Sequence, residues 1–349
     1  NHKLDEREAF SFHRYFLLTQ VYFFQRDLQE NNHRGALLQM AQRIHIMKFM
    51  NRLTPLVVSL LALGLMTGCI PDKYGFSEEF GKPGSGRGEY LSPTDMDLTP
   101  DGDLVISDSG NNRIQVVSPK NGAYKLAFGE YGTSGYKMSD TAGCGVNPLT
   151  GEVWVCDMRG NKLVKFSKTG APLLKVDKKM KLPIDVAVDG QGNIYVLMSK
   201  QADIVKFDGF GSHIGNIGGT GKTALVFPTS ITAREDALYV TDYGGKRILK
   251  MSFTGELIKE YTKKGEYEEL KGPSNIFIDS RGNLLVLDMG EVPIAILAPD
   301  GQLLSKIGEF GNEKGQFLYP RGIVSTSNGE ILVLDNSRNC ILTFKNAAK

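Results

Sequence analysis

One acidic residue recurs along the chain, always after a short apolar stretch and before a polar turn. Its five copies are Asp108, Asp157, Asp242, Asp288 and Asp335. A carboxylate in such a place can ligate a metal or act in catalysis, but it can also accept hydrogen bonds from nearby backbone N–H groups and fix the turn. Because catalysis needs only one constellation, the repetition favours the structural role. Arg113 and Arg247 follow two of these aspartates and are expected to have similar local roles.

A second set of polar residues could form a ligand site. Each member stands at the beginning of a repeated apolar stretch, and the set consists of Asp95, Asp185, Ser230, Asn275 and Arg321. Carboxylate and amide oxygens are ligands that a hard cation such as calcium prefers. These residues can act together only if the segments that carry them meet at one place.

The segments that carry both sets belong to an internal repeat. Six units begin at Pro93, about Ala142, Pro183, Pro228, Pro273 and Pro320, roughly 45 residues apart. Each unit holds three or four short strands separated by Asp-Gly, Asn-Gly or Gly-Asn turns, which is the hairpin signal. This period and strand content are typical of propeller blades. The sequence therefore predicts an all-β, six-bladed β-propeller, in which the first strand of each unit lies nearest the axis and the second set of polar residues converges on one mouth of the central channel.

The repeated pattern also resembles a known family. The pattern that the repeats follow is G-x-G-x-F-x-x-P, then an apolar strand, then a D-G turn, a strand ending in Asp and the sequence N-x-R-I. This pattern resembles the NHL repeat, and it appears most fully at 93–117, with Asp108, Asn112 and Arg113 in the signature positions, and at 308–344. The resemblance extends over roughly residues 74 to 346 and implies the same six-bladed propeller. Three units depart from the pattern, with Met198 in place of the aspartate and Pro293 or Cys340 in place of the arginine.

The last unit lacks a fourth strand of its own. The segment KYGFSEEFG at 73–81 resembles the glycine-bounded last strand of other units, such as YKLAFGEYG at 124–132. We therefore expect the strand around Phe76 to Phe80 to complete the last blade, so that the propeller domain spans 73–349. Closing the ring in this way removes a free sheet edge.

The N-terminal part differs from the repeats. Residues 1–46 lack an initiating Met and are interpreted as upstream sequence that is not part of the native protein, the alternative being a helical segment that binds a partner or membrane. Residues 47–68 combine a basic start, an apolar run and small residues, which is typical of a secretory signal. The ending Met-Thr-Gly-Cys resembles the lipobox of bacterial lipoproteins, which implies acylation of Cys69 and a short tether at 69–72. Ile70 after that cysteine favours the outer membrane in a bacterium with two membranes.

Composition and histidine content exclude several function classes. The net charge of +2 gives no strong field for nucleic acid, so none is expected as a partner. His213 is the only histidine in the repeats, and a zinc site of several imidazoles cannot be built from it. This argues against a lyase resembling the peptidyl-amidating lyases. A Ser-His-Asp triad would also need His213, which we expect to be a solvated strand residue.

Three cysteines lie in the propeller region. Cys144 and Cys156 are predicted on the first two strands of one hairpin, where a disulfide can form in an oxidising compartment if the register brings the Cβ atoms together. A buried free thiol at Cys144 is the alternative. Cys340 has no evident partner in the sequence.

These observations lead to one main functional hypothesis and one alternative. The main hypothesis is an extracytoplasmic, lipid-anchored NHL-type propeller without a cofactor, which serves as a binding or scaffold module for a protein, peptide or glycan at the cell envelope. The alternative is a hydrolase or lactonase with a divalent cation, such as calcium, at the propeller axis. That alternative follows from a resemblance to propellers of the gluconolactonase type, and it uses Asp95, Asp185 and Asn275 as ligands.

Overall fold

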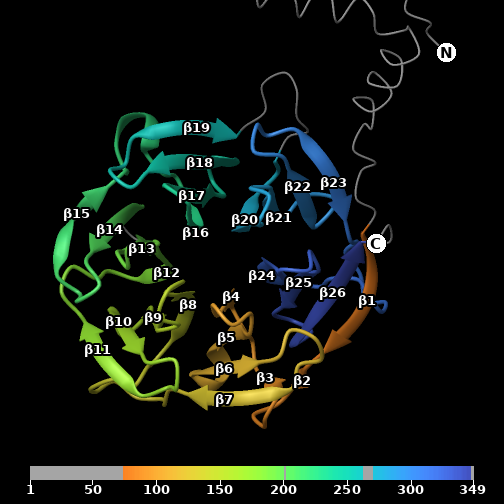
Figure 1. The fold of residues 1–349 in the computed structure, drawn as a ribbon, viewed down its shortest axis with the longest axis horizontal. Coiled ribbons are helices and arrows are strands. Elements are labelled where there is room, and N and C mark those ends of the chain that lie inside the picture. The colour runs from red at the N-terminus through yellow and green to blue at the C-terminus, as the bar shows by residue number, and fades with distance from the viewer. Residues whose placement is uncertain (1–73, 200–201, 262–269, 347–349) are drawn as a thin grey trace, which may run out of the picture. The chain divides into compact units, whose positions relative to one another are not determined.

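The chain folds into a ring of six four-stranded antiparallel sheets arranged around a central axis (Figure 1). The structure is a computed structural model, and it describes residues 74–199, 202–261 and 270–346. The predicted all-β, six-bladed propeller is confirmed. No helix in these ranges is long and apolar enough to cross a membrane. The predicted signal segment and Cys69 lie outside the described residues.

The blades follow one another along the chain, with the innermost strand first. Blade 1 consists of β4 (Asp95–Leu98), β5 (Leu104–Asp108), β6 (Arg113–Val117) and β7 (Tyr124–Phe128). Blade 2 consists of β8 (Thr141–Val146), β9 (Val153–Asp157), β10 (Lys162–Phe166) and β11 (Pro172–Val176). Blade 3 consists of β12 (Pro183–Val188), β13 (Ile194–Met198), β14 (Asp203–Phe207) and β15 (His213–Ile217). Blade 4 consists of β16 (Pro228–Arg234), β17 (Ala237–Asp242), β18 (Arg247–Ser252) and β19 (Leu257–Tyr261). Blade 5 consists of β20 (Pro273–Ile278), β21 (Leu284–Asp288), β22 (Ile294–Leu297) and β23 (Leu303–Ile307).

Blade 6 is built from both ends of the described chain. It contains β24 (Pro320–Ser325), β25 (Ile331–Asp335), β26 (Cys340–Asn346) and, as its outermost strand, β1 (Tyr74–Phe80). β1 runs antiparallel to β26 from the Tyr74–Asn346 pair to the Phe80–Ile341 pair. The Phe76 ring meets the Phe344 ring edge-on at 6.0 Å. The prediction that an N-terminal strand closes the ring is therefore confirmed.

The second strand of each blade is mostly apolar because it is covered on both faces along its whole length. The strands LVISD, VWVCD and ILVLD, for example, are buried at every residue. Side chains from the two faces of one blade enter different core clusters, each shared with a neighbouring blade. The core is thus a series of layers between blades, which is the stacking expected of a propeller.

The connections divide between the two faces of the ring. Neighbouring strands are antiparallel, so two kinds of loop lie on the same side of the ring. These are the loops that lead into the innermost strands and the loops between the second and third strands of a blade. We call this side the start face. The shorter connecting segments here include β2 (Lys82–Pro83), β3 (Glu89–Tyr90) and the 3₁₀ turns η1 (Ser109–Asn111) and η2 (Gly221–Thr223). The remaining loops lie on the opposite side, which we call the end face.

The considered disulfide between Cys144 and Cys156 is not formed, and both thiols are free and buried. Cys144 pairs with Val155 across the β8–β9 ladder, in the regular stretch that continues from the Val146–Val153 pair beside the turn. Cys156 is therefore one residue out of step and points to the other face of the sheet. Cys144 joins the core between blades 1 and 2, whereas Cys156 joins the core between blades 2 and 3.

Candidate functional site: the central channel and the start face

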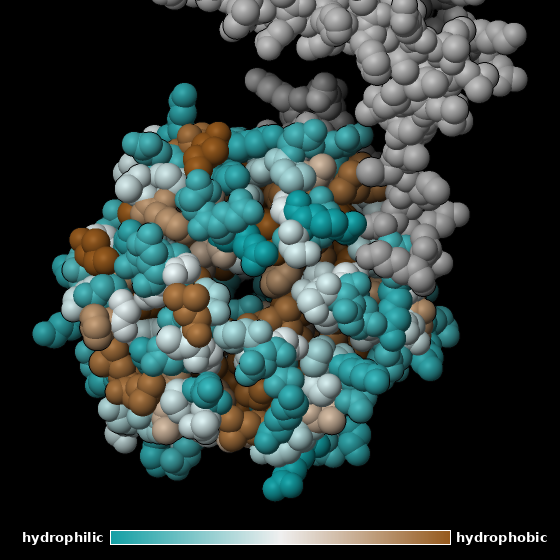
Figure 2. All heavy atoms as spheres, viewed as in Figure 1, coloured by the Kyte–Doolittle hydropathy of each residue, from teal (hydrophilic) through white to brown (hydrophobic). Residues whose placement is uncertain are grey.

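The innermost strands of all six blades surround a central cavity of about 310 Å³. In the space-filling view the ring is hollowed at its centre, with apolar side chains around the opening (Figure 2). Four of the five residues predicted at the channel mouth line this cavity, namely Asp95, Asp185, Ser230 and Asn275. Their position at the beginning of an innermost strand is what brings them together.

Arg321 is the fifth predicted residue, and it is not among the residues that line the cavity. Its guanidinium group lies over the ring of Tyr319, 5.4 Å from the ring centre, and Nη1 donates to the Tyr319 hydroxyl at 3.4 Å. The arginine therefore belongs to the start face. Asp97, which the sequence analysis did not select, does line the cavity, and its spacing of two residues from Asp95 was the available signal.

The carboxylates in the channel tie neighbouring blades together. Asp95 Oδ2 accepts the backbone N–H of Cys144 at 2.9 Å, and Asp97 Oδ2 accepts that of Val146 at 2.8 Å, which joins blade 1 to blade 2. Asp185 Oδ2 accepts the N–H of Ile231 at 2.8 Å, which joins blade 3 to blade 4. The innermost strands have no direct ladder with one another, so these side chains substitute for one.

Burial keeps these acids easier to protonate than free aspartate. Burial raises the pKa of Asp97 to about 6 and that of Asp185 to about 7, although their backbone hydrogen bonds oppose the shift. Burial, followed by the neighbouring Asp185 carboxylate, holds the pKa of Asp95 well above its usual range. Near neutral pH the channel therefore holds protons as well as negative charge.

The channel residues do not fit a calcium site. Calcium takes about six to eight oxygen ligands, mostly from carboxylates and carbonyls. In the channel, oxygens of Asp95, Asp97 and Asp185 already accept backbone N–H groups. Within the described parts of the chain, no group of three or more His, Cys, Asp and Glu side chains is placed to hold a metal ion.

The repeated aspartates at the ends of the second strands lie on the start face and hold its loops. Asp242 Oδ1 accepts the N–H groups of Val226 and Phe227 at 3.0 and 2.9 Å, while Arg247 Nε donates to Oδ2 at 3.1 Å. Asp335 in the same way accepts the N–H groups of Leu318 and Tyr319. Asp157 binds the N–H groups of residues 139 and 140, and Asp288 those of residues 271 and 272.

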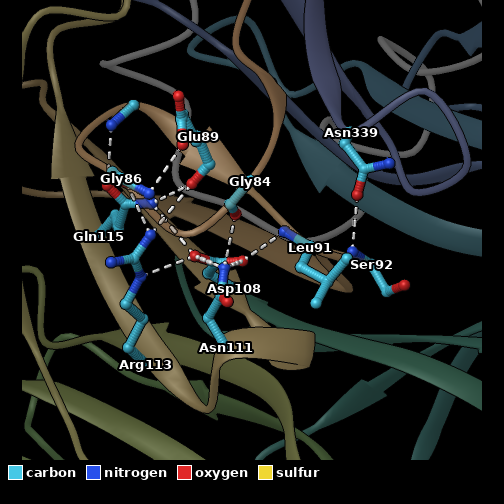
Figure 3. A network of polar contacts seen from close by, with 11 residues as sticks. Gly84, Gly86, Glu89, Leu91, Ser92, Asp108, Asn111, Arg113, Gln115 and Asn339 are labelled. Atoms are coloured by element: carbon cyan, nitrogen blue, oxygen red, sulfur yellow. Dashed lines mark hydrogen bonds and ion pairs between the residues drawn. The ribbon is translucent and has the colours of Figure 1, made fainter.

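Figure 3 shows the blade 1 version of this arrangement. Asp108 is fully buried and accepts the Leu91 N–H at 2.8 Å through Oδ1. Its other oxygen accepts Arg113 Nε at 2.8 Å and the buried Gln115 amide at 3.1 Å. Arg113 Nη2 also donates to the Glu89 carbonyl oxygen, so the segment before β4 is fixed to blade 1 by its backbone.

These loops present apolar side chains to solvent. Of the fourteen large apolar side chains that are exposed in the described residues, nine lie on the start face: Leu91, Tyr131, Tyr136, Val226, Phe227, Tyr243, Phe310, Leu318 and Tyr319. The sequence analysis did not find this feature. Its signal was the apolar residue or pair shortly before the proline that begins a repeat, as in Val-Phe-Pro at 226–228 and Leu-Tyr-Pro at 318–320.

Comparison with known proteins supports the repeat assignment. Residues 90–117 and 317–344 match the family model described as NHL repeat. The chain contains NHL repeats. Both NHL matches cover the segment from the residues just before an innermost strand to the end of a third strand, so each includes the aspartate that holds the start-face loop.

Curated relatives align with this chain over part of their own length. The human E3 ubiquitin-protein ligase TRIM32 is 23% identical over 285 residues, which are 77% of this chain and 38% of that protein. The protein brain tumor of Drosophila melanogaster is 25% identical over 148 residues, which are 40% of this chain and 14% of that protein. The chain thus spans well under half the length of these relatives.

Solved structures share the fold. A streptogramin B lyase structure superposes with a TM-score of 0.55 at 16% identity, covering 78% of this chain and 97% of that one. The virginiamycin B lyase of Staphylococcus aureus gives a TM-score of 0.55 at 15% identity, covering 78% and 99%. At this identity the likeness extends to the fold alone.

Proposed function

We propose that the NHL propeller is a binding or scaffold module that recognises a protein, peptide or glycan through its start face. The observation that carries this proposal is the concentration of exposed apolar side chains on that face. Exposed apolar groups gathered on one side of a soluble fold are typical of interaction surfaces. The buried aspartates hold the backbone beneath these side chains, which lowers the entropic cost of binding.

We further propose that the module is anchored by an acylated Cys69 at the outer side of a membrane, the outer membrane where a bacterium has two. The lipobox-like sequence supports this proposal. The strand β1, which begins at Tyr74, lies at the rim of the ring (Figure 1). Four residues lie between it and Cys69, so the chain between them spans at most about 18 Å. Attachment at the rim leaves both faces of the ring open to partners.

Site-specific photo-crosslinking in intact cells tests the binding function. A crosslinking residue at Tyr319, on the start face, is expected to give discrete adducts that disappear when unlabelled chain is present in excess. The matched control is Leu149, which is exposed in an end-face loop. Equal adducts from both positions, or none from either, would contradict the proposed role of the start face.

Metabolic labelling tests the anchor separately. An alkyne-bearing fatty acid should label the wild-type chain, and Cys69→Ala should lose both the label and membrane association. Retention of the label in that variant would place the modification elsewhere and refute the assignment to Cys69.

The alternative is a metal-dependent hydrolase with its cation between Asp95, Asp185 and Asn275, and it makes a distinct prediction. A native-state ligand present at 100 times its Kd raises the free energy of unfolding by about 2.7 kcal/mol. Calcium, magnesium, manganese or zinc added after chelation should then raise the melting temperature, and Asp95→Asn should abolish the rise. Because the channel oxygens are engaged by backbone N–H groups, we expect no shift with any of the four ions.

A further inference from the structure

We propose that the start face at blades 3 and 4 binds an acidic protein segment that also carries apolar side chains. This inference rests on the proposed binding function, and it names the surface and the chemistry of the partner. Two adjacent features carry it. One is an apolar cluster on blade 4, and the other is a lysine-rich loop that leads into blade 3.

The blade 4 apolar cluster consists of Val226, Phe227 and Tyr243. Their exposed fractions are 66%, 55% and 41%, which are large values for such side chains. The rings of Phe227 and Tyr243 meet edge-on at 6.1 Å, and Asp242 holds the backbone N–H groups of Val226 and Phe227. A Cβ on Gly244 would lie 2.9 Å from the Phe227 Cβ, so glycine permits the close approach of the two loops. The cluster is therefore both exposed and held in place, as expected of the central residues of an interface.

The lysine-rich loop spans residues 177–182, between β11 and β12 on the start face. Lys178, Lys179 and Lys181 are exposed. The only acidic residue of the loop, Asp177, already pairs with Lys175 at 2.7 Å. Where blades 4 and 6 have an exposed apolar pair before the proline of the innermost strand, blade 3 has Lys181 followed by a half-buried Leu182. The loop thus presents positive charge at the position where those blades present apolar side chains.

The two features lie on neighbouring blades and face the same side. The hydrogen bond from the Ile231 N–H to Asp185 joins β12 of blade 3 to β16 of blade 4, and each feature directly precedes one of these strands. Lys246, in the same loop as Tyr243, adds an exposed positive charge beside the apolar cluster. A partner that covers both features gains most when it places carboxylates against the lysines and apolar side chains against the cluster.

A protein segment fits this surface better than a nucleic acid does. Single-stranded nucleic acids bind by stacking bases on flat aromatic rings along a basic groove. One of the three cluster residues, Val226, is aliphatic and offers no ring. The rings of Phe227 and Tyr243 meet edge-on, so they do not form a row of parallel faces on which successive bases could stack. The chain as a whole carries a net charge of only +2.

Selection from a random 12-residue peptide library displayed on phage tests the proposal, with the full chain in detergent as the target. Enriched peptides are expected to combine Asp or Glu with aromatic or aliphatic residues. Phe227→Ala and, separately, Lys181→Glu should each weaken their binding about tenfold or more. Phe210→Ala is the matched control, because Phe210 is 87% exposed in an end-face loop. Its affinity should equal that of the wild type, and all four proteins should keep the same melting temperature.

The outcomes separate the two levels of the proposal. Enriched peptides that bind Phe227→Ala and Lys181→Glu as well as wild type would refute this site while leaving the general binding function intact. No enrichment of any composition would count against both. A photo-crosslinker at Phe227 in chain reconstituted into nanodiscs with anionic lipid adds a third outcome. Adducts with the lipid, and none with an enriched peptide, would assign the cluster to the membrane and overturn the proposal.

Discussion

Single buried carboxylates decide how the loops of this propeller are placed. Asp242 has no exposed surface, and it receives backbone N–H groups from two loops and the guanidinium group of Arg247. The same side chain therefore stabilises the fold and positions the blade 4 apolar cluster. In these repeats a residue that looks purely structural also shapes the proposed binding surface.

Substitution of Asp242 should affect the fold strongly. Asp242→Ala leaves Arg247 and several N–H groups without their acceptor, and the loss of one member of a buried ionic network costs about 3 to 5 kcal/mol. Denaturant unfolding monitored by circular dichroism measures the change. Asp236→Ala is the matched control, because Asp236 is an exposed acid in the turn that precedes the same strand. Equal stability of the two variants would show that the hydrogen bonds of Asp242 contribute little.

The channel acids should make stability fall as pH rises. The pKa of Asp185 is about 7 in the folded chain, above the ordinary value of 3.8, and that of Asp97 is about 6. Between these ordinary and raised values the folded chain binds more protons than the unfolded chain, so its free energy of unfolding decreases from about pH 4 to pH 7. The melting temperature of wild type should therefore drop between pH 4.5 and 8 by roughly 5 °C or more beyond that of Asp185→Asn. Identical pH profiles for the two proteins would contradict this assignment.

At the scale of elements, close contact between innermost strands depends on glycine. A Cβ on Gly145 in β8 would lie 2.3 Å from the Val186 carbonyl oxygen of β12, and a Cβ on Gly143 would lie 2.7 Å from that of Ile184. Blades 2 and 3 thus approach each other backbone to backbone, whereas blades 3 and 4 are bridged by a carboxylate. The channel wall is built differently from one blade junction to the next.

Gly145→Ala should push β8 and β12 apart. Overpacking of this kind costs about 1 to 3 kcal/mol. Gly215→Ala in β15 is the matched control, because a Cβ there meets no atom within 4 Å. Thermal unfolding should show a clear loss for the first variant and little change for the second. A loss of the same size in both would point to a general effect of replacing glycine in these strands.

The strands and blades could be predicted from the sequence, whereas the residues of the central channel could be predicted only in part. Strands, turns and repeat length are set locally, so the six blades and the role of β1 could be read from the chain. The convergence of Asp95 and Asp185 followed from their equivalent places in the repeat. The pairing of β8 with β9 places Val155, and not Cys156, opposite Cys144, and this register depends on how the turn between the two strands closes, which the sequence left open. The long Arg321 side chain points towards the Tyr319 ring, and the repeat pattern does not predict the direction of a side chain.

At the scale of the whole molecule, β1 closes the ring by joining the two ends of the described chain in one blade. Phe76 packs against Phe344 of β26, and Phe80 reaches Gly122 of blade 1, where an added Cβ would lie 2.3 Å from its ring. One strand therefore contacts its own blade and the next one. Loss of these contacts would expose the edge of β26, and unpaired edges promote association.

The double variant Phe76→Ala, Phe80→Ala should weaken the closure of the ring by β1. Both rings are half-buried, so we expect a loss of about 2 to 4 kcal/mol in the free energy of unfolding and a tendency to associate. Ser77→Ala, at an exposed position of the same strand, is the control. Size-exclusion chromatography and thermal unfolding measure the two effects. A monomeric double variant with wild-type stability would show that the ring closes without β1.

The sharing of blade 6 between distant parts of the chain also sets an order of events in time. β1 pairs with a strand that follows it by more than 260 residues, as the Tyr74–Asn346 pair shows. Contacts of such long sequence separation form slowly, because the entropy of closing the loop is lost before the contact is made. During synthesis β1 is present early but has no partner until β26 has emerged. We therefore expect blade 6 to be completed last in folding, so that until then a nearly finished ring carries an open strand edge that could pair with the edge of another copy.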